Sequence, residues 1–165
     1  MASFCIRRAL PGDAEEIERI EQACFSAPWS LESIRAGFQN ETDLFYIAEA
    51  DGTTTGYLGL SRVLDECYLY NLAVHPRYRR RGIARQLLGR ACEEMFASGA
   101  SFVSLEVRTS NAAAIALYSG MGFRRAGERK NFYSSPQVDA VIMTRTREDK
   151  EESTIENSGD RKLMR

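Results

Sequence analysis

The sequence predicts an α/β fold in which a mixed sheet of about seven strands is flanked by about four helices. Two observations predict it. Short segments rich in β-branched and aromatic residues alternate with segments whose apolar residues recur at helical spacing. The middle of the chain runs strand, helix, strand, helix, an order typical of α/β proteins. The length of 165 residues suits one domain with a single core.

The first half of the chain is expected to supply two helices and four strands. Pro11 and the glycine after it end the first strand, and Asp13 with Glu16 has the spacing of a capping box at a helix start. Asp51 and the following glycine are typical of a hairpin turn. The expected elements are a strand at residues 4–9, a helix after Asp13, a short helix from Ser30, and strands at residues 44–50, 56–63 and 67–74.

The second half contains the clearest helix of the sequence. Its apolar residues recur every three or four positions, as on one face of a helix, and Gly99 is placed to end it. The expected elements are a helix at residues 82–98, a strand at 102–108, a helix at 112–119 and a final hairpin at 123–132 and 138–146. We expect residues 1–147 to form the domain. Residues 148–165 are mostly charged and polar, so we expect a disordered tail.

Composition and charge exclude several classes of protein. The net charge of −1 gives the whole molecule no polyanion-binding character, and no apolar run approaches the ~20 residues of a membrane span. The cysteines at positions 5, 24, 67 and 92 and the single His75 lack the spacing of a metal site. We therefore expect no metal, buried thiols in a reducing compartment, and a cytoplasmic protein without a signal peptide.

An arginine-rich segment joins the strand that ends at Val74 to the clearest helix. A helix start carries unpaired N–H groups and partial positive charge, which suit a phosphate. Gly82 permits close backbone approach, and Ala84 keeps the next turn small. The charges are supplied by Arg79, Arg80, Arg81 and Arg85. The competing interpretations are a solvated charge run and a nucleic-acid contact. The preceding strand and the glycine at the helix start favour a pyrophosphate site, and the neutral net charge argues against nucleic acid.

Glu106, Asn111 and Tyr118 form the second group of candidate residues. Strand alternation places Glu106 on the sheet face opposite to its apolar neighbours. Asn111 and Tyr118 are seven residues apart and share a helix face, with Asn111 placed as the N-cap. Acetyl transfer to an amine needs a base for the ammonium proton, a donor for the carbonyl oxygen and an acid for the leaving thiolate. Taken singly, Glu106 fits a surface ion-pair partner equally well, and core packing is the default interpretation of Tyr118. Together with the arginine-rich segment, the two residues favour the catalytic interpretation.

The segment Arg79-Arg80-Arg81-Gly82-Ile83-Ala84 resembles the (Gln/Arg)-x-x-Gly-x-(Gly/Ala) motif of the GCN5-related N-acetyltransferases (GNAT). The resemblance extends over residues 4–146 and implies the GNAT fold, with a splayed central strand pair that holds the pantetheine arm of acetyl-coenzyme A. It implies that the turn binds pyrophosphate through backbone amides. The implied cofactor contacts are Leu72, Ala73, Val74, Arg79, Arg80, Arg81, Gly82, Ile83, Ala84 and Arg85.

Residues 105–118, followed by a Gly-Phe pair at 122–123, resemble a bacterial GNAT subfamily that acetylates the N-terminal alanine of a ribosomal protein. Residues 28–30, 63–66, 71–74 and 130–133 match as well. The resemblance implies that Glu106 accepts the proton, Tyr118 donates one and Asn111 contacts acetyl-coenzyme A. It implies direct transfer to the N-terminal peptide of a small-subunit ribosomal protein, without an acyl-enzyme. We expect no nucleic-acid or membrane partner and favour a monomer.

The acceptor side is less well defined by the sequence. Trp29, Tyr133 and the acidic pair Asp65-Glu66 are candidate wall residues. For Trp29 the sequence favours packing between two helices instead, and for the acidic pair it favours a solvated turn. Residues 134–137 form a shorter loop than the subfamily has. Two alternatives therefore stay open, a lysine side chain or small amine as acceptor, and a non-catalytic module that binds acyl-coenzyme A or RNA.

Overall fold

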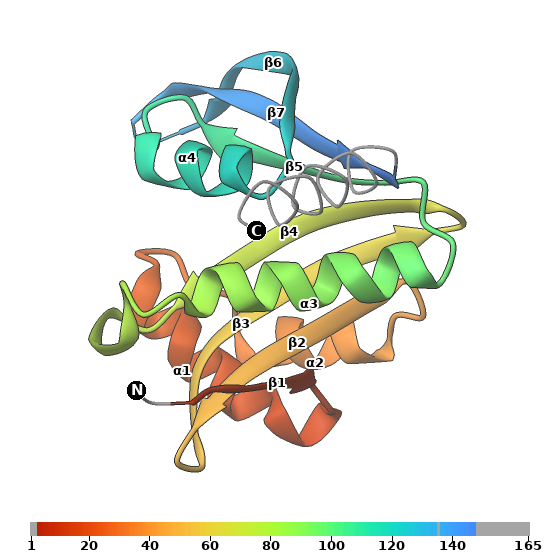
Figure 1. The fold of residues 1–165 in the computed structure, drawn as a ribbon. Coiled ribbons are helices and arrows are strands. Elements are labelled where there is room, and N and C mark those ends of the chain that lie inside the picture. The colour runs from red at the N-terminus through yellow and green to blue at the C-terminus, as the bar shows by residue number, and fades with distance from the viewer. Residues whose placement is uncertain (1–2, 135, 148–165) are drawn as a thin grey trace, which may run out of the picture.

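The computed structural model describes residues 3–134 and 136–147, which form one seven-stranded sheet with helices on both faces (Figure 1). The predicted domain limits at residue 147 and the predicted tail at residues 148–165 stay predictions, because the tail lies outside the described residues. The strands are β1 (Cys5–Arg8), β2 (Asp43–Ala50), β3 (Thr53–Val63), β4 (Glu66–Val74), β5 (Phe102–Arg108), β6 (Arg124–Tyr133) and β7 (Val138–Thr146). The helices are α1 (Ala14–Cys24), α2 (Leu31–Gln39), α3 (Ile83–Ala97) and α4 (Ala112–Gly120).

The strand order is β1-β2-β3-β4-β5-β7-β6, and β4 with β5 is the parallel pair. This pair is joined only from Glu66 opposite Phe102 to Leu69 opposite Leu105. Beyond that point both strands continue without pairing to each other, β4 to Val74 and β5 to Arg108. The predicted mixed sheet with a splayed central pair is therefore confirmed. The splay leaves backbone groups of both strands unpaired toward the gap.

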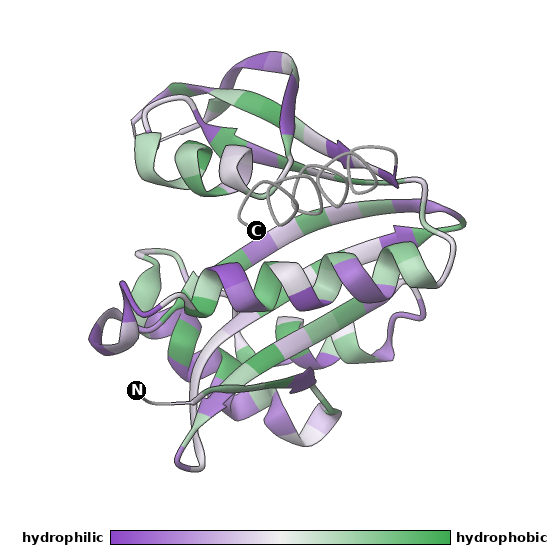
Figure 2. Cartoon of the chain, in the orientation of Figure 1, coloured by the Kyte–Doolittle hydropathy of each residue, from purple (hydrophilic) through white to green (hydrophobic). Residues whose placement is uncertain are grey.

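The helices cover the sheet in two layers. Ile17 and Ile20 of α1 and Ile34 of α2 pack on one face against Phe45 and Ile47 of β2. The opposite face is covered by α3 and α4, and α3 supplies the larger share of apolar side chains: Ile83, Leu87, Leu88, Ala91, Cys92, Met95 and Phe96. Figure 2 shows hydrophilic and hydrophobic residues interspersed along α3, as expected for a helix with one exposed and one buried side. This packing fixes the start of α3 beside the end of β4.

The helix starts predicted after Asp13 and at Ser30 are capped differently. Ser30 caps α2, because its side chain accepts a hydrogen bond from the Ser33 N–H at 3.1 Å. The capping box of Asp13 and Glu16 was wrong. The Asp13 carboxylate instead accepts from the Arg7 guanidinium at 2.9 Å and from the Leu10 N–H at 2.7 Å. A charge-assisted bond to an arginine replaces the cap and ties β1 to the start of α1.

Tyr70 forms a bulge in β4 just where the strand leaves β5. In the register with β3, Gly59 lies opposite Asn71 and Leu60 lies opposite Leu69, so Tyr70 has no partner. A Cβ atom on Gly59 would lie 2.7 Å from the Tyr70 ring, so glycine makes room for this side chain. Bulges bend a strand and re-aim its side chains. The bulge therefore turns β4 away from β5 at the splay.

The cysteines are free thiols, but the prediction that all are buried was wrong. Cys67 and Cys92 are buried, Cys24 is partly exposed and Cys5 is exposed. Among residues 3–134 and 136–147, no group of three or more His, Cys, Asp or Glu side chains could hold a metal ion. In the same part of the chain, no helix is long and apolar enough to cross a membrane.

Candidate active site

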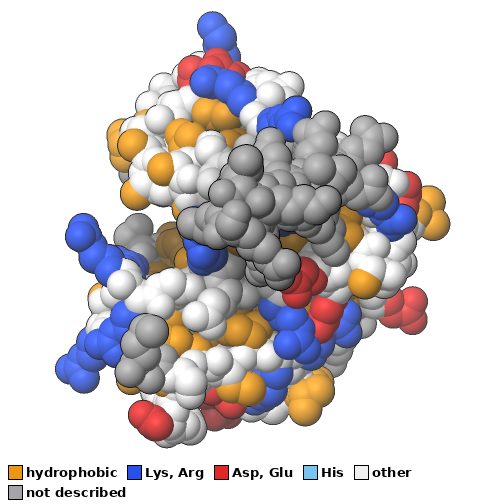
Figure 3. Space-filling model, in the orientation of Figure 1, with side chains coloured by type: hydrophobic (Ala, Val, Ile, Leu, Met, Phe, Trp, Pro, Cys, Tyr) orange, Lys and Arg blue, Asp and Glu red, His pale blue; other side chains and the backbone are white. Residues whose placement is uncertain are grey.

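The loop between β4 and α3 has the backbone form of an anion site. Arg80 has φ of 62° and Gly82 has φ of 77°, both in the left-handed region. Gly82 is the N-cap of α3, and a Cβ atom there would meet no atom within 4 Å. The first hydrogen bond of α3 runs from the Gln86 N–H to the Gly82 carbonyl, so the N–H groups before it have no partner inside the helix. Figure 3 shows Lys and Arg side chains at the left-hand edge, over this loop.

A cavity of about 570 Å³ opens beside this loop, between the end of β4 and α4, and we call it the α3 cavity. Its residues include every predicted cofactor contact except Arg81. They are Cys24, Phe25, Leu72, Ala73, Val74, Tyr78, Arg79, Arg80, Gly82, Ile83, Ala84, Arg85, Asn111, Ala113, Ala114, Leu117 and Tyr118. An elongated phosphate-bearing molecule fits these walls, because N–H groups and arginines lie at one end and apolar strand backbone at the other.

The arginines at the mouth of the cavity differ in what they contact. Arg79 folds back on β4, donating from Nε to the Val74 carbonyl at 3.0 Å. The Arg81 guanidinium lies 5.3 Å from the centre of the Tyr78 ring and does not line the cavity, and its predicted contact with the pyrophosphate stays a prediction. A cation–π contact with Tyr78 therefore engages this guanidinium. Arg80 and Arg85 are exposed and line the cavity. Within the described part of the chain, their guanidinium groups make no contact like those of Arg79 and Arg81.

A second cavity of about 250 Å³ lies in the gap between β4 and β5, and we call it the splay cavity. Its residues are Phe25, Leu69, Tyr70, Asn71, Leu72, Leu105, Glu106, Val107, Arg108, Asn111, Ala114, Tyr118 and Tyr133. Leu72, Asn111, Ala114 and Tyr118 line both cavities, so they form the wall between them. Of these two cavities, Glu106 lines only the splay cavity. The sequence prediction that Glu106, Asn111 and Tyr118 come together is thus met by the geometry.

The Glu106 carboxylate is partly exposed and paired. Its Oε1 lies 2.9 Å from Nε of Arg129 on β6, with 29% of the Glu106 side chain and 57% of the Arg129 side chain exposed. Glu106 is therefore both an ion-pair partner of Arg129 and a residue beside the gap between β4 and β5. A pair this open to water is weak, so it leaves the carboxylate available to a competing cation.

Tyr118 projects from α4 toward the wall that the two cavities share. Burial, followed by the nearby Tyr133, raises the pKa of the Tyr118 phenol to about 12. Among the described residues, no hydrogen bond occupies its hydroxyl. Its ring packs against Phe123, 5.9 Å away between centroids, as a core residue would. The phenol is therefore protonated at neutral pH and free to donate a hydrogen bond into the cavity.

Asn111 is the helix cap that the sequence predicts. Its Oδ1 accepts from the Ala114 N–H at 3.1 Å, which confirms it as the N-cap of α4. This bond uses the carbonyl oxygen of the amide and leaves the NH₂ group for another partner. Because Asn111 lines both cavities, that donor is available at the wall between them.

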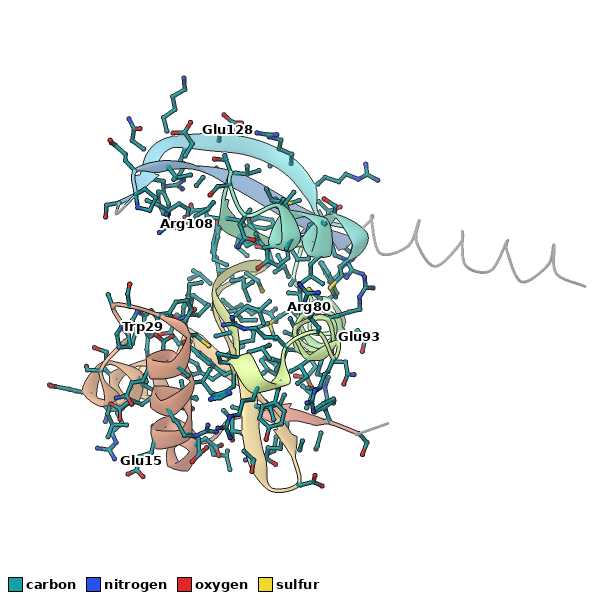
Figure 4. All side chains as sticks on the ribbon, turned by 90° about the vertical axis from the view of Figure 1, so that its left-hand side faces the viewer. Glu15, Trp29, Arg80, Glu93, Arg108 and Glu128 are labelled. Atoms are coloured by element: carbon teal, nitrogen blue, oxygen red, sulfur yellow. The ribbon has the colours of Figure 1, made fainter. Side chains whose placement is uncertain are left out.

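Aromatic rings lie at the positions predicted to wall the acceptor side. Trp29 stacks on Tyr70 of β4 with 5.5 Å between ring centroids, and 39% of its surface is exposed, so its ring contacts the sheet, and its role as a wall residue stays a prediction. Tyr133 lies under the Arg108 guanidinium at 4.3 Å. Figure 4 shows Trp29 and Arg108 facing the same open side, with Arg80 on the opposite side of β4. Asp65 and Glu66 lie outside the cavities, at the β3–β4 turn, which supports the solvated-turn interpretation.

Sequence reasoning missed several residues of this region. Phe25, Tyr70 and Asn71 line the splay cavity, and Arg129 pairs with Glu106, but none was singled out. The only available signal was the position of Tyr70 and Asn71 within the strand that leads to the arginine-rich loop. Arg129 belongs to an edge strand whose pairing with β5 is indirect, through β7. Nothing in a linear pattern shows that contact.

Residues 14–123 match the acetyltransferase (GNAT) family, and these residues contain the arginine-rich loop, β4, β5 and α4. The chain belongs to the GNAT family. Its fold and loop geometry agree with that assignment, and the co-substrate of GNAT enzymes is acetyl-coenzyme A. All residues of the α3 cavity lie within the matched segment, and so do those of the splay cavity except Tyr133.

Named GNAT relatives share most of the chain. It is 42% identical over 127 residues to the [ribosomal protein bS18]-alanine N-acetyltransferase of Salmonella typhimurium, covering 76% of this chain and 85% of the relative. It is 35% identical over 139 residues to the N-alpha-acetyltransferase RimI of Mycobacterium tuberculosis, covering 81% and 86%. The crystal structure of the ribosomal-protein-S18-alanine N-acetyltransferase from Escherichia coli superposes with a TM-score of 0.82 at 36% identity, covering 87% of this chain and 94% of that one.

Proposed function

We propose that this protein transfers the acetyl group of acetyl-coenzyme A directly to the N-terminal α-amine of a protein, and that its substrate is a ribosomal protein that begins with alanine. The observation that carries the proposal is the wall of Leu72, Asn111, Ala114 and Tyr118 between the α3 cavity, with its arginines and helix start, and the splay cavity, which holds the Glu106 carboxylate. The named relatives that act on the alanine of ribosomal protein bS18 support the choice of acceptor.

The α3 cavity is suited to hold acetyl-coenzyme A. The N–H groups at the start of α3, with Arg80 and Arg85, would bind the pyrophosphate, and the unpaired backbone of β4 at Leu72 to Val74 would bind the pantetheine arm. When bound, acetyl-coenzyme A supplies a thioester carbonyl that an amine can attack. An N–H group of the splayed part of β4 would donate to the carbonyl oxygen as negative charge develops there.

Glu106 and Tyr118 would handle the two protons of the reaction. The α-amine enters as an ammonium group, and Glu106 accepts its proton from the splay cavity, directly or through water. An N-terminal amine has a pKa roughly two to three units below that of lysine, so one carboxylate is a sufficient base near neutral pH. Tyr118 donates its hydroxyl proton, as a hydrogen bond or in full, to the leaving sulfur.

Mass spectrometry of acetylated acceptors tests the proposal. The acceptors are a peptide that begins with alanine and contains an internal lysine, the same peptide blocked at its α-amine, a polyamine and an aminoglycoside. The expected product carries one acetyl group on the α-amine of the free peptide. Acetylation of the lysine or of the small amines alone would replace the proposed acceptor with those alternatives. Salt-dependent RNA binding without acetylation of any amine would reject the enzymatic proposal.

A further inference from the structure

His75 is the only histidine of the chain, and the proposed reaction does not use it. It lies between the end of β4 and the arginine-rich loop, and its backbone N–H donates to the Thr55 carbonyl of β3 at 2.8 Å. Its side chain lines neither the α3 cavity nor the splay cavity. Any role of His75 in the site must therefore act through a neighbouring group.

The His75 ring holds the first turn after β4. Its Nδ1 accepts a hydrogen bond from the Arg77 N–H at 3.2 Å, and the His75 carbonyl accepts from the Tyr78 N–H at 2.8 Å. These two bonds close a short 3-10 helix at Pro76–Tyr78. Pro76 has no N–H, so the Arg77 N–H is the first donor of this turn. The imidazole caps it as a side-chain acceptor caps the start of a longer helix.

This turn leads directly into the phosphate end of the α3 cavity. Tyr78 lines the cavity, and its ring meets the His75 ring edge to face with 6.1 Å between centroids. Nε of Arg79 then donates to the Val74 carbonyl at 3.0 Å. Arg80 follows with φ of 62°, a conformation that a residue other than glycine keeps only when its neighbours support it. The bonds of His75 and Arg79 fix the chain just before that position.

The bond at Nδ1 of His75 exists only while the imidazole is neutral. Nδ1 offers a lone pair to the Arg77 N–H in the tautomer whose proton is on Nε2, and the imidazolium has no acceptor. Protonation would set two N–H groups against each other and add a positive charge beside Arg19 of α1 and Arg77 and Arg79 of the loop. Partial burial, followed by the charges of these three arginines, lowers the pKa of His75 from its ordinary value. The closed turn is therefore the form present at neutral pH.

We propose that His75 is a positioning residue for acetyl-coenzyme A, because its neutral Nδ1 holds the turn that presents the backbone N–H groups of the arginine-rich loop to the pyrophosphate. This inference rests on the proposed function, which places the pyrophosphate at the start of α3. Protonation of His75 opens the turn. The affinity for the pyrophosphate therefore falls on acidification.

Protonation of His75 has two opposing effects on binding, and the geometry decides between them. A cationic ring adds attraction for a phosphate, but this ring lies outside the cavity, which Arg79, Arg80 and Arg85 already line. Salt screens a charge at that position. The lost hydrogen bond, in contrast, changes the backbone that contacts the ligand, and one such bond corresponds to about fivefold in affinity. We therefore expect weaker rather than tighter binding.

Calorimetric titration with dephospho-coenzyme A between about pH 8 and pH 5 tests the inference. This probe keeps the pyrophosphate and lacks the 3′-phosphate, so no phosphate of the ligand titrates in the range. His75→Asn and His75→Gln form a matched pair. The asparagine oxygen lies where Nδ1 lies and can accept the N–H two residues later, whereas the glutamine oxygen lies where Nε2 lies.

We expect His75→Asn to bind the probe like the wild type at pH 8, and His75→Gln and His75→Ala to bind about fivefold more weakly. On acidification the wild type should lose about fivefold in affinity relative to His75→Asn, which has no proton to gain. Since the chain has one histidine, its ring ¹H and ¹⁵N NMR signals belong to His75. They should show the proton on Nε2 and a lower pKa with the probe bound than without it, as linkage requires.

Two outcomes would overturn the inference while leaving the acetyl-coenzyme A site intact. Wild-type affinity that stays constant or rises on acidification relative to His75→Asn would mean that the imidazole acts by its charge or not at all. Equal affinities of the three variants at pH 8 would mean that the acceptor at Nδ1 does not matter. If the wild type fails to bind the probe at every pH, the pyrophosphate site of the proposed function fails and this inference falls with it.

Discussion

Nε of Arg129 lies 2.9 Å from Oε1 of Glu106, so the proposed base is held by a residue of β6, the edge strand of the sheet. This contact brings two explanations of Glu106 into one place. As an ion-pair partner, Glu106 would matter only for holding β6 against the sheet. As a base, it would matter for the reaction whether or not Arg129 is present. The two explanations predict different losses of activity for variants of Glu106 relative to variants of Arg129.

We expect Glu106→Gln to reduce kcat/KM by about 10² to 10⁴, the usual range for removal of a general base. Arg129→Ala removes the same ion pair but keeps the carboxylate. Because the pair is open to water, we expect Arg129→Ala to change the free energy of unfolding by less than about 1 kcal/mol and kcat/KM by less than about fivefold. Steady-state kinetics and urea unfolding of both variants provide the measurement. Equal losses of activity in the two variants would leave Glu106 with a structural role only.

Gly82 and Gly52 provide a matched pair for the phosphate loop. Both have φ of 77°, and a Cβ atom at either position would meet no atom within 4 Å. Alanine at each therefore costs the same backbone strain, about 1–2 kcal/mol of unfolding free energy. Only Gly82 lines the α3 cavity, whereas Gly52 lies in the β2–β3 turn.

We expect Gly82→Ala to weaken acetyl-coenzyme A binding by about 10-fold or more, because the new methyl group occupies the space where the pyrophosphate approaches the backbone. Gly52→Ala should bind acetyl-coenzyme A like the wild type. Calorimetric titration gives the affinities, and thermal unfolding confirms that both variants lose similar stability. Undiminished affinity in Gly82→Ala would place the pyrophosphate elsewhere.

Asn111 has one role in stability and another in binding, and two substitutions separate them. The cap uses Oδ1, and serine can replace it, whereas alanine cannot. We expect Asn111→Ala to lose about 1 kcal/mol of unfolding free energy and Asn111→Ser to lose much less. Both lack the NH₂ donor, so both should raise KM for acetyl-coenzyme A by about 3- to 10-fold. If KM instead follows stability, so that only Asn111→Ala is affected, the amide does not contact acetyl-coenzyme A.

Local sequence signals were enough for the elements and for one side of the site. The α3 helix was predictable because its apolar residues repeat with helical period, and the loop before it because arginines and Gly82 are adjacent in sequence. Asn111 and Tyr118 were predictable because one helix carries both. The side-chain contact of Arg81 could not be predicted, since the guanidinium lies over the ring of Tyr78, three residues earlier in the chain.

The acceptor side depends on contacts between distant segments, which no local pattern contains. The bulge at Tyr70 arises from the register of β3 with β4, and Glu21 meets Tyr57 and Asn71 across two strands. A signal for Glu21 was nevertheless present, because it follows Ile17 by four residues and so lies on the apolar face of α1. A charged residue at such a position needs buried partners, and that requirement could have marked it.

Tyr118 connects the site with the pH dependence of folding. Its pKa is raised to about 12 in the folded protein, from an ordinary value of 10, because burial disfavours the phenolate. The unfolded chain therefore releases this proton first as pH rises. The contribution of Tyr118 to stability is complete below pH 10 and is lost between pH 10 and about 12.

We expect the wild type to lose unfolding free energy steeply above pH 10, and Tyr118→Phe to lose about 1–2 kcal/mol less between pH 9 and 11.5, since phenylalanine has no proton to release. Urea unfolding at the two pH values measures the difference. Tyr118→Phe should also reduce kcat by at least about 10²-fold at neutral pH while acetyl-coenzyme A binds normally. An unchanged kcat with the altered alkaline stability would show that the phenol is buried as a core residue and takes no part in the transfer.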